Sequence, residues 1–424
     1  MGAASYVVWG KSVVGEAIVK QARGAGGVEE TYGPGRIQRR GFVKGAVGVA
    51  GFAATAAVLA ACAENEVLTP DDTGAAPQNP TDTAGTSFAG PQINWEMATS
   101  WPESLVTLYG AAQFFAEKVS ELTGGAFKIT PKPAGEPIGA LGVLPAVRDL
   151  EVDMGHSAAY YHVNLSPVQQ FGTTVPFGLT QRQQNAWLYQ AGGLKMLNDF
   201  YAEEHQIITF PAGSTGCQMG GWFTKEVQTE TDLHGLRMRI PGLAGQVLEN
   251  LGGEQVDLGA DDIRDAIQRG EIDSAEFVGP TDDLILGLDE FDGQLYYYHP
   301  GWWEPGATLE VQISLERWNE LPPYYQSVVE IAAMATSINT VAHYDYRNQI
   351  DLKKIQQFAI IREFSPELMR AFKAETENVL NGLASENPQF GAIFEPWRSF
   401  RDSISVWHGL AERSFLSQQS TIWI

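Results

Sequence analysis

Cysteine is scarce in this sequence, because its 424 residues include only Cys62 and Cys217. Two cysteines exclude a disulfide-stabilised scaffold and leave a zinc site of the Cys/His type without enough ligands. Positive charge is also scarce: 28 Lys and Arg face 51 Asp and Glu, which gives a formal net charge of −23. Nucleic-acid binding needs clustered Lys and Arg against the phosphates, so we expect no nucleic-acid partner.

Signatures of catalysis and nucleotide binding are missing as well. Residues 242–245, Gly-Leu-Ala-Gly, lack the spacing of a phosphate-binding loop. Cys217 has no base beside it in the sequence and is expected to be a small buried residue. Asp282 and Asp283 are interpreted as a solvated helix start. The length leaves room for one large or two medium domains with a substantial core.

Residues 1–61 predict an export signal. Arg39 and Arg40 precede an apolar run rich in Gly and Ala, an arrangement typical of a twin-arginine signal. The run ends in Leu-Ala-Ala-Cys at residues 59–62, which resembles a lipobox and would make Cys62 a lipidated first residue. The alternative is an uncleaved membrane anchor, although the run is short and poor in large apolar residues for a spanning helix.

Residues 62–91 predict a flexible tether, because they are rich in Thr, Ala, Pro and Asp and have almost no large apolar residues. A lipidated Cys62, a tether and a soluble domain together describe a protein held at a membrane surface without spanning it. We therefore expect a periplasmic or cell-surface location.

The remaining chain predicts an α/β fold. Residues 93–98 alternate like a strand, residues 105–122 repeat apolar side chains at helical spacing, and a strand follows from residue 127. Alternating strands and helices favour largely parallel sheets. Residues 146–153 resemble residues 266–273, each a helix end and a short strand that runs into His156 or Glu276. The similarity indicates either two lobes whose strand ends face one cleft or a chance match of a common pattern.

Polar side chains at the ends of strand-like runs are candidates for a binding site. Arg239 could hold a carboxylate through two parallel hydrogen bonds, with a helix start nearby. Arg237 is an equal candidate on spacing, and a surface salt bridge is the competing interpretation for both. Glu276 lies between Ala275 and Phe277 in a half-buried run, where a carboxylate needs a cation or hydrogen-bonding partners.

Gln218 precedes Gly220 and Gly221, which permit close backbone approach. Amide, carboxylate and main-chain oxygens suit a hard cation such as Na⁺ or Ca²⁺ better than zinc. Taken singly, each of these residues is also readily explained as an ordinary satisfied polar group. The aromatic runs at residues 160–161 and 296–303 either wall a pocket or fill the core.

A family resemblance rests on six segments that follow one another along the chain. They are Ser-Ala-Ala-Tyr-Tyr (157–161), Val-Pro-Phe-Gly (175–178), Ser-Thr-Gly-Cys-Gln-Met-Gly-Gly-Trp-Phe (214–223), Met-Arg (238–239), Glu-Phe-Val-Gly-Pro (276–280) and Pro-Gly-Trp-Trp-Glu (300–304). With them, residues 93–417 resemble the extracytoplasmic solute-binding proteins of TRAP transporters, the DctP-type family. The similarity is closest to its 2-oxo acid (alpha-keto acid) binding branch.

The resemblance implies a two-lobed, periplasmic-binding-protein-like fold that closes on a small carboxylate and delivers it to a membrane permease, without catalysis. It implies that Arg239 holds the ligand carboxylate. It also implies that Gln218, Glu276 and the backbone oxygen of Phe277 bind Na⁺ or Ca²⁺, which bridges to the 2-oxo group. The aromatic side chains expected to complete the pocket are Tyr160, Tyr161 and Trp303.

The same resemblance implies one lobe of residues 92–216 with 305–344 and a second of residues 217–304 with 345–395. Residues 396–424 would form a long C-terminal helix that exchanges between two subunits of a homodimer. Ser214, Phe277 and Thr281 depart from the branch, which has Asn, Trp and Tyr at these positions. These departures affect the identity of the ligand more than the carboxylate anchor.

Three alternatives stay open beside a 2-oxo acid such as pyruvate. The first is a receptor for lactate or another hydroxy acid with bound Ca²⁺. The second is a metal-dependent enzyme in which Glu276 activates water on a substrate held by Arg239, although no nucleophile–base pair accompanies Glu276. The third is a sensory module whose closed form docks a receptor.

Overall fold

The structure is a computed structural model that describes residues 90–423. The predicted twin-arginine signal, its lipobox with Cys62, and nearly all of the predicted tether lie outside the described residues. Between residues 90 and 423, no helix combines the length and the apolar character that crossing a membrane requires.

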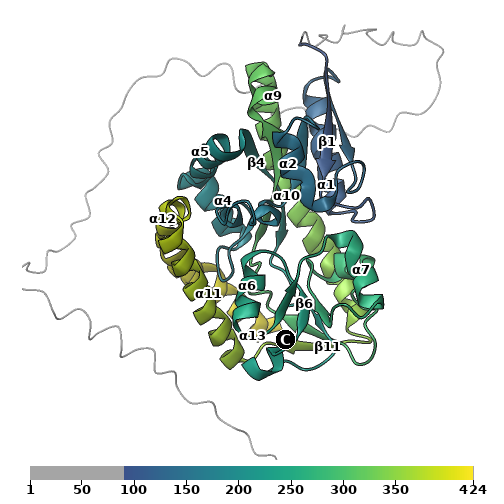
Figure 1. Ribbon diagram of the computed structural model, residues 1–424, viewed down its shortest axis with the longest axis vertical. Coiled ribbons are helices and arrows are strands. Elements are labelled where there is room, and N and C mark those ends of the chain that lie inside the picture. Colours follow the sequence, from purple (N-terminus) through teal and green to yellow (C-terminus); the bar gives the residue numbers. More distant parts are fainter. Residues whose placement is uncertain (1–89, 424) are drawn as a thin grey trace, which may run out of the picture. The chain divides into compact units, whose positions relative to one another are not determined.

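Two sheets organise the fold (Figure 1). The first has five strands in the order β2-β1-β3-β10-β4, and the second has six in the order β11-β9-β5-β8-β6-β7. The strands are β1 Ile93–Thr99, β2 Phe127–Lys132, β3 Met154–Ser157, β4 Ile207–Gly216, β5 Trp222–Phe223, β6 Arg237–Arg239, β7 Glu254–Val256, β8 Ser274–Ala275, β9 Tyr296–His299, β10 Ala307–Ser314 and β11 Ile360–Glu363.

Helices surround both sheets. They are α1 Leu108–Leu122, α2 Val143–Arg148, α3 Gln169–Thr173, α4 Gln181–Gln190, α5 Gly193–His205, α6 Gly242–Asn250, α7 Ala260–Gln268, α8 Pro280–Ile285, α9 Leu315–Glu320, α10 Pro323–Ile355, α11 Pro366–Glu386, α12 Pro388–His408 and α13 Ser414–Trp423. Short 3₁₀ turns occur at η1 Ala140–Gly142, η2 Ala159–His162 and η3 Glu230–Leu233, and a π-helical segment, η4 Gly409–Arg413, joins α12 to α13.

Pairing in the two sheets follows one pattern. In the first, β3 is parallel to β1 and β10 is antiparallel to both β3 and β4. In the second, β8 is parallel to β6 and β5 is antiparallel to both β8 and β9. Each sheet therefore has one reversed strand among otherwise parallel ones, and the predicted α/β class is confirmed.

The internal similarity corresponds to equivalent positions in these sheets. Its first copy contains the end of α2 and leads into β3, and its second contains the end of α7 and leads into β8. This equivalence favours two related lobes over a chance match. The helix predicted from residue 105 begins at Leu108, because Leu105 N–H bonds back to Pro102 O in a turn.

Separate apolar clusters hold the helices on the sheets. Phe115 of α1 and Val329 of α10 pack with Val311 of β10 on one face of the first sheet. On the second sheet, Ile263 of α7 belongs to one cluster and Leu368 of α11 to another. Burying large aliphatic and aromatic side chains in this way supplies most of the driving force for folding.

The chain passes from the first sheet to the second between β4 and β5, and it returns between β9 and β10. Helix α10 contacts β4 and α1 in the first lobe and α8 in the second (Figure 1). The predicted lobe boundary after residue 344 falls within this continuous helix, and the exact boundaries stay a prediction. The long C-terminal helical segment begins at Pro388, before the predicted start at residue 396.

Glu310 generates a prediction about stability. It lies on β10, a strand buried at every position, and burial raises its pKa to about 7. A carboxyl group whose pKa is raised by folding stabilises the protein below its unfolded pKa, and it loses that contribution as the pH rises through 7. We expect Glu310→Gln to increase the free energy of unfolding at pH 8 by up to about 3 kcal/mol, and much less at pH 5. Urea unfolding at both pH values measures this difference, and equal effects at pH 5 and 8 would contradict it.

Candidate functional site

Strand register brings Arg239 and Glu276 together. β6 runs parallel to β8 with Arg239 opposite Ala275, so the next residue, Glu276, lies beside the guanidinium. Arg239 Nη1 donates to Glu276 Oε1 at 2.5 Å and to Glu276 O at 2.8 Å, and Arg239 Nε donates to Leu258 O at 3.1 Å. Both side chains are only 1% exposed. A buried carboxylate and a buried guanidinium each need such a partner.

Arg237 lies two residues before Arg239 on the same strand, so both side chains point to the same face of the sheet. Arg237, at the start of β6, is part-exposed and forms a salt bridge with Asp273, with Nη2 and Oδ1 2.7 Å apart, whereas Arg239, at the end of β6, is buried. Of the two arginines that were equal candidates on spacing, the surface salt bridge therefore describes Arg237, and Arg239 is the buried one.

Gln218 lies on the crossover from β4 to β5, where tight backbone packing positions it. A Cβ atom at Gly221, which has φ +81°, would lie 2.9 Å from Ala275 O. The predicted close approach at this glycine is confirmed. Gln218 is 5% exposed, and its Nε2 donates to Thr215 Oγ1 at 3.0 Å.

Glu304 is a buried carboxylate that the sequence analysis did not assign to the site. It lies on the return crossover, where Gln218 N–H donates to Glu304 O at 3.2 Å. Burial raises the pKa of Glu304 to about 7, although Arg239 opposes this shift. The available sequence signal was its position directly after Trp302 and Trp303 and before Pro305.

A small cavity of about 10 Å³ is lined by Gln218 and Glu304, whereas Arg239 and Glu276 are not part of its lining. Its lining is Trp101, Leu108, Ala158, Tyr160, Tyr161, Thr215, Gln218, Phe277, Val278, Glu304, Ala307 and Leu309. Burial raises the pKa of Tyr161 to about 12, with Arg239 as the strongest neighbouring charge. Burial also raises the pKa of Tyr160 well above its usual range, with Glu304 as the strongest neighbouring charge. Both tyrosines thus belong to the site, each nearer a different charged group.

Four of the buried polar atoms without a hydrogen-bond partner lie on these residues: Gln218 Oε1, Glu276 Oε2, Glu304 Oε2 and Arg239 Nη2. Buried polar atoms are normally hydrogen-bonded, so such a concentration requires an explanation. Three acceptor oxygens suit a hard cation, and a guanidinium N–H suits a carboxylate. Among residues 90–423 no group of three His, Cys, Asp or Glu could hold a metal, so a cation here would also need amide and main-chain oxygens.

The pKa shifts of Glu276 and Arg239 agree with a site for a cation and a carboxylate. Burial raises the pKa of Glu276 well above its usual range, Arg239 opposes the shift and Glu304 adds to it. For Arg239, burial disfavours the charge, but the carboxylate of Glu276 and the two tyrosines raise its pKa. When both carboxyl groups are ionised, the site has more buried negative charge than its one arginine neutralises.

Several predicted residues lie outside the cavity. Trp303 is buried against Trp302, with ring centroids 5.1 Å apart, and is absent from the lining. The run at residues 296–298 forms β9, where Tyr297 and Tyr298 are core residues. His156 is fully buried behind the site, and its Nδ1 accepts a hydrogen bond from Trp101 Nε1 at 2.7 Å.

Of the three residues that depart from the 2-oxo acid branch, two do not line the cavity. Ser214 Oγ accepts from Gly216 N–H at 3.2 Å, and Thr281 Oγ1 donates to Asp351 Oδ2 at 2.8 Å. Neither side chain lines the cavity, whereas Phe277 does. The departure with a direct effect on the cavity wall is therefore the one at residue 277.

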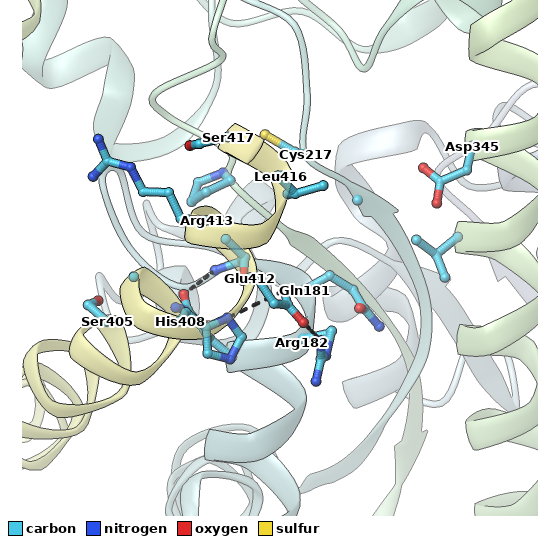
Figure 2. Close-up of a pocket in the computed structure, with 16 residues that line it drawn as sticks. Gln181, Arg182, Cys217, Asp345, Ser405, His408, Glu412, Arg413, Leu416 and Ser417 are labelled. Atoms are coloured by element: carbon cyan, nitrogen blue, oxygen red, sulfur yellow. Dashed lines mark hydrogen bonds and ion pairs between the residues drawn. The ribbon is translucent and has the colours of Figure 1, made fainter. Parts of the chain in front are cut away.

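Two other expectations were wrong. Cys217 is exposed, because the crossover turns its side chain away from the core while Gly216 and Gln218 stay buried. It faces a cavity of about 770 Å³ at the C-terminal helices, where Glu412 contacts Arg182 (Figure 2). Asp282 and Asp283 do begin α8, but they are 0% and 1% exposed, since phenol and indole donors replace their water.

Residues 97–387 match the family described as bacterial extracellular solute-binding protein, family 7, or DctP. The chain belongs to this family. Its predicted recognition as a DctP-type solute-binding protein is confirmed.

Known relatives cover most of the chain. The monocarboxylate 2-oxoacid-binding periplasmic protein of Nostoc sp. is 43% identical over 79% of this chain and 91% of its own length. A TRAP solute-binding protein of Bordetella bronchiseptica, a mixed-occupancy dimer with calcium and picolinate, is 36% identical with a TM-score of 0.76 over 78% of this chain and 98% of its own. Proteins of Colwellia psychrerythraea, with calcium and pyruvate, and Pseudoalteromonas atlantica, with sodium and pyruvate, are each 31% identical with a TM-score of 0.74 over 77% of this chain and 99% of theirs.

The buried ion pair generates a prediction about stability. We expect Arg239→Met to lower the free energy of unfolding by about 3–5 kcal/mol, because it leaves the buried carboxyl group of Glu276 without its partner. Adding Glu276→Gln should recover most of that loss. Urea unfolding of the two single variants and the double variant measures the coupling. Arg237→Met is the matched control, with an expected change of about 1 kcal/mol or less. A double variant as unstable as Arg239→Met would show that the pair does not account for the loss.

Proposed function

We propose that the protein is the extracytoplasmic receptor of a TRAP transporter and binds a small organic monocarboxylate, preferably a 2-oxo acid such as pyruvate, together with Ca²⁺ or Na⁺. The observation that carries the proposal is the set of four unpartnered buried polar atoms on Gln218, Arg239, Glu276 and Glu304. Relatives that hold pyruvate with calcium or sodium support both the ligand and the cation.

Arg239 Nη2 would donate to the ligand carboxylate. Its Nε and Nη1 are already hydrogen-bonded to the protein. Arg239 would therefore bind the carboxylate through one nitrogen, and not through the two parallel hydrogen bonds expected from the sequence. The hydroxyl of Tyr161, whose strongest neighbouring charge is Arg239, would donate to the same carboxylate. Tyr160, whose strongest neighbouring charge is Glu304, would contact the ligand on the Glu304 side of the site.

Gln218 Oε1, Glu276 Oε2 and the main-chain oxygen of Phe277 would coordinate the cation, with Glu304 Oε2 as a further ligand. Hard cations prefer oxygen ligands of this kind. The 2-oxo oxygen of the ligand would complete the coordination, which links ligand binding to cation binding. Trp303 would stabilise the Glu276 carboxylate. Its indole lowers the pKa of Glu276, although this effect is smaller than those of burial and of the neighbouring charges.

Lobe closure would convert binding into delivery. We take one lobe as residues 92–216 with 305–344 and the other as residues 217–304 with 345–395. A ligand that contacts both lobes stabilises the closed form over the open one by its differential affinity. The membrane permease then receives the ligand from the closed receptor.

Export and anchoring complete the proposal. Arg39 and Arg40 would direct export by the twin-arginine route, and a lipidated Cys62 would hold the protein at a membrane surface through the tether. Both features rest on the sequence alone. They are compatible with the periplasmic location of the Nostoc relative.

The carboxylates give the test of this function. Calorimetric titration of the purified full-length protein with pyruvate, after chelation and again with Ca²⁺, should show binding that depends on the cation. We expect Glu276→Gln and Glu304→Gln each to weaken binding at least tenfold, because a neutral amide is a poorer cation ligand. Glu310→Gln, an equally buried glutamate on β10 that accepts a hydrogen bond from Gln312 Nε2, is the control and should leave the affinity unchanged. Pyruvate binding that is independent of Ca²⁺ would contradict the cation site.

A homodimer is part of the proposal. Val406, Trp407, Leu410, Phe415 and Leu416 expose apolar side chains along the C-terminal helices, with Leu410 74% exposed. Helix α10 exposes Ile331, Met334 and Ile338 at helical spacing. A second copy of the chain would cover these faces, as the dimeric Bordetella relative suggests.

Removing the apolar face tests the dimer. We expect the double substitution Trp407→Ser and Leu410→Ser to halve the molar mass seen by light scattering, because it removes buried apolar area from the interface. Val106→Ser with Leu165→Ser, two exposed apolar residues elsewhere, should leave the mass unchanged. A wild-type protein of single-chain mass, or a dimer that survives the first double substitution, would refute the proposed interface.

A further inference from the structure

The peptide unit between Phe277 and Val278 is tied to the protein on one side. Val278 N–H donates to Asp283 Oδ1 at 3.3 Å, and Val278 O accepts from Met219 N–H at 3.1 Å. These two bonds fix the backbone immediately after Phe277. The orientation of the Phe277 carbonyl group then follows from the planar geometry of the peptide.

A trans peptide is planar, and its N–H and C=O groups point in opposite directions. With Val278 N–H directed at Asp283, the carbonyl oxygen of Phe277 must point away from Asp283. Phe277 and Val278 both line the small cavity with Gln218 and Glu304. The hydrogen bond to Asp283 therefore determines which side of the loop presents a free oxygen.

Asp283 is itself held rigidly. Its side chain is 1% exposed, and its Oδ2 accepts from Trp222 Nε1 at 3.0 Å and from Tyr297 OH at 2.7 Å. The two aromatic rings belong to neighbouring strands and are stacked with centroids 4.3 Å apart. All three neighbouring groups donate, so both oxygens of the Asp283 carboxyl group serve as hydrogen-bond acceptors.

The adjacent Asp282 has a different environment. It is equally buried, but its Oδ2 accepts from Tyr344 OH at 2.6 Å, on helix α10. None of its hydrogen bonds reaches the loop of residues 276–279. The two neighbouring aspartates thus separate the effect of burying a carboxylate on α8 from the effect of holding Val278.

We propose that Asp283 is a positioning residue for the cation: by accepting the Val278 N–H, it turns the Phe277 carbonyl oxygen toward the ion. The inference rests on the proposed cation site and adds a residue to it that does not touch the ion. Trp222 and Tyr297 contribute indirectly: they hold the Asp283 carboxylate in place, and this carboxylate orients the peptide between Phe277 and Val278.

Asp283→Asn tests this role with almost no change in shape. The asparagine side chain offers one acceptor and one NH₂ donor group. If its oxygen faces Trp222 and Tyr297, its NH₂ meets the Val278 N–H. If it is flipped, its NH₂ meets the Trp222 N–H, which cannot accept. We expect titration of Ca²⁺ into the chelated full-length protein, at fixed pyruvate, to show at least tenfold weaker Ca²⁺ binding.

A second substitution should rescue this variant. Trp222→Phe removes the competing N–H, so the introduced amide can turn its NH₂ to Tyr297 and its oxygen to Val278. We expect Asp283→Asn combined with Trp222→Phe to bind Ca²⁺ within threefold of Trp222→Phe alone. Asp282→Asn is the matched control and should bind Ca²⁺ within threefold of the wild type. Circular dichroism and thermal unfolding show which variants are folded.

The outcomes separate the two proposals. Weaker Ca²⁺ binding in Asp283→Asn with rescue by Trp222→Phe supports the positioning role. Cation-dependent binding in the wild type with no loss in Asp283→Asn overturns it and leaves the proposed function intact. An equal loss in Asp282→Asn, or no rescue, also overturns it, since burial alone would then explain the effect. A wild type without cation-dependent binding of pyruvate overturns both proposals.

Discussion

The buried ion pair of Arg239 and Glu276 is the interaction on which the site depends. Removing two charges from water is costly, and the pair is tolerable only because each group finds the other at hydrogen-bond distance. The register of β6 and β8 fixes that distance. Because Arg239 also binds Leu258 O, one guanidinium nitrogen and one oxygen of Glu276 remain. The pair therefore determines which atoms a ligand can meet.

The location of the other polar groups separates a fixed part of the site from a part that the proposed closure would move. Gln218 and Glu304 lie on the two crossovers and are joined by a backbone hydrogen bond, so a change in the angle between the lobes moves them little relative to each other. Tyr160 and Tyr161 follow β3 of the first sheet, whereas Arg239 belongs to the second. In the proposed closure, we therefore expect the largest change in the separation between the tyrosines and the guanidinium.

Local sequence patterns predicted the α/β class, indicated related lobes with a chance match as the alternative, and placed Glu276 in a half-buried run, because these follow from side-chain periodicity and strand ends. They could not separate Arg237 from Arg239, since both side chains point to the same face of one strand and only contacts with segments distant in the sequence determine which of the two is buried. Asp283 was misjudged for a similar reason: its donors, such as Tyr297, come from strands distant in the sequence. Glu304 was missed because its burial also depends on contacts between segments far apart.

Charge explains why the cation and the anion should bind together. Glu276 and Glu304 bring two negative charges into a buried site, and Arg239 brings one positive charge, so an ionised site has a net charge of −1. A monocarboxylate alone would raise the excess to −2 in a medium that screens charge poorly. Ca²⁺ with one monocarboxylate makes the sum zero, whereas a dicarboxylate would restore a negative excess. Each ligand therefore lowers the cost of binding the other, and such coupling is reciprocal by thermodynamic necessity.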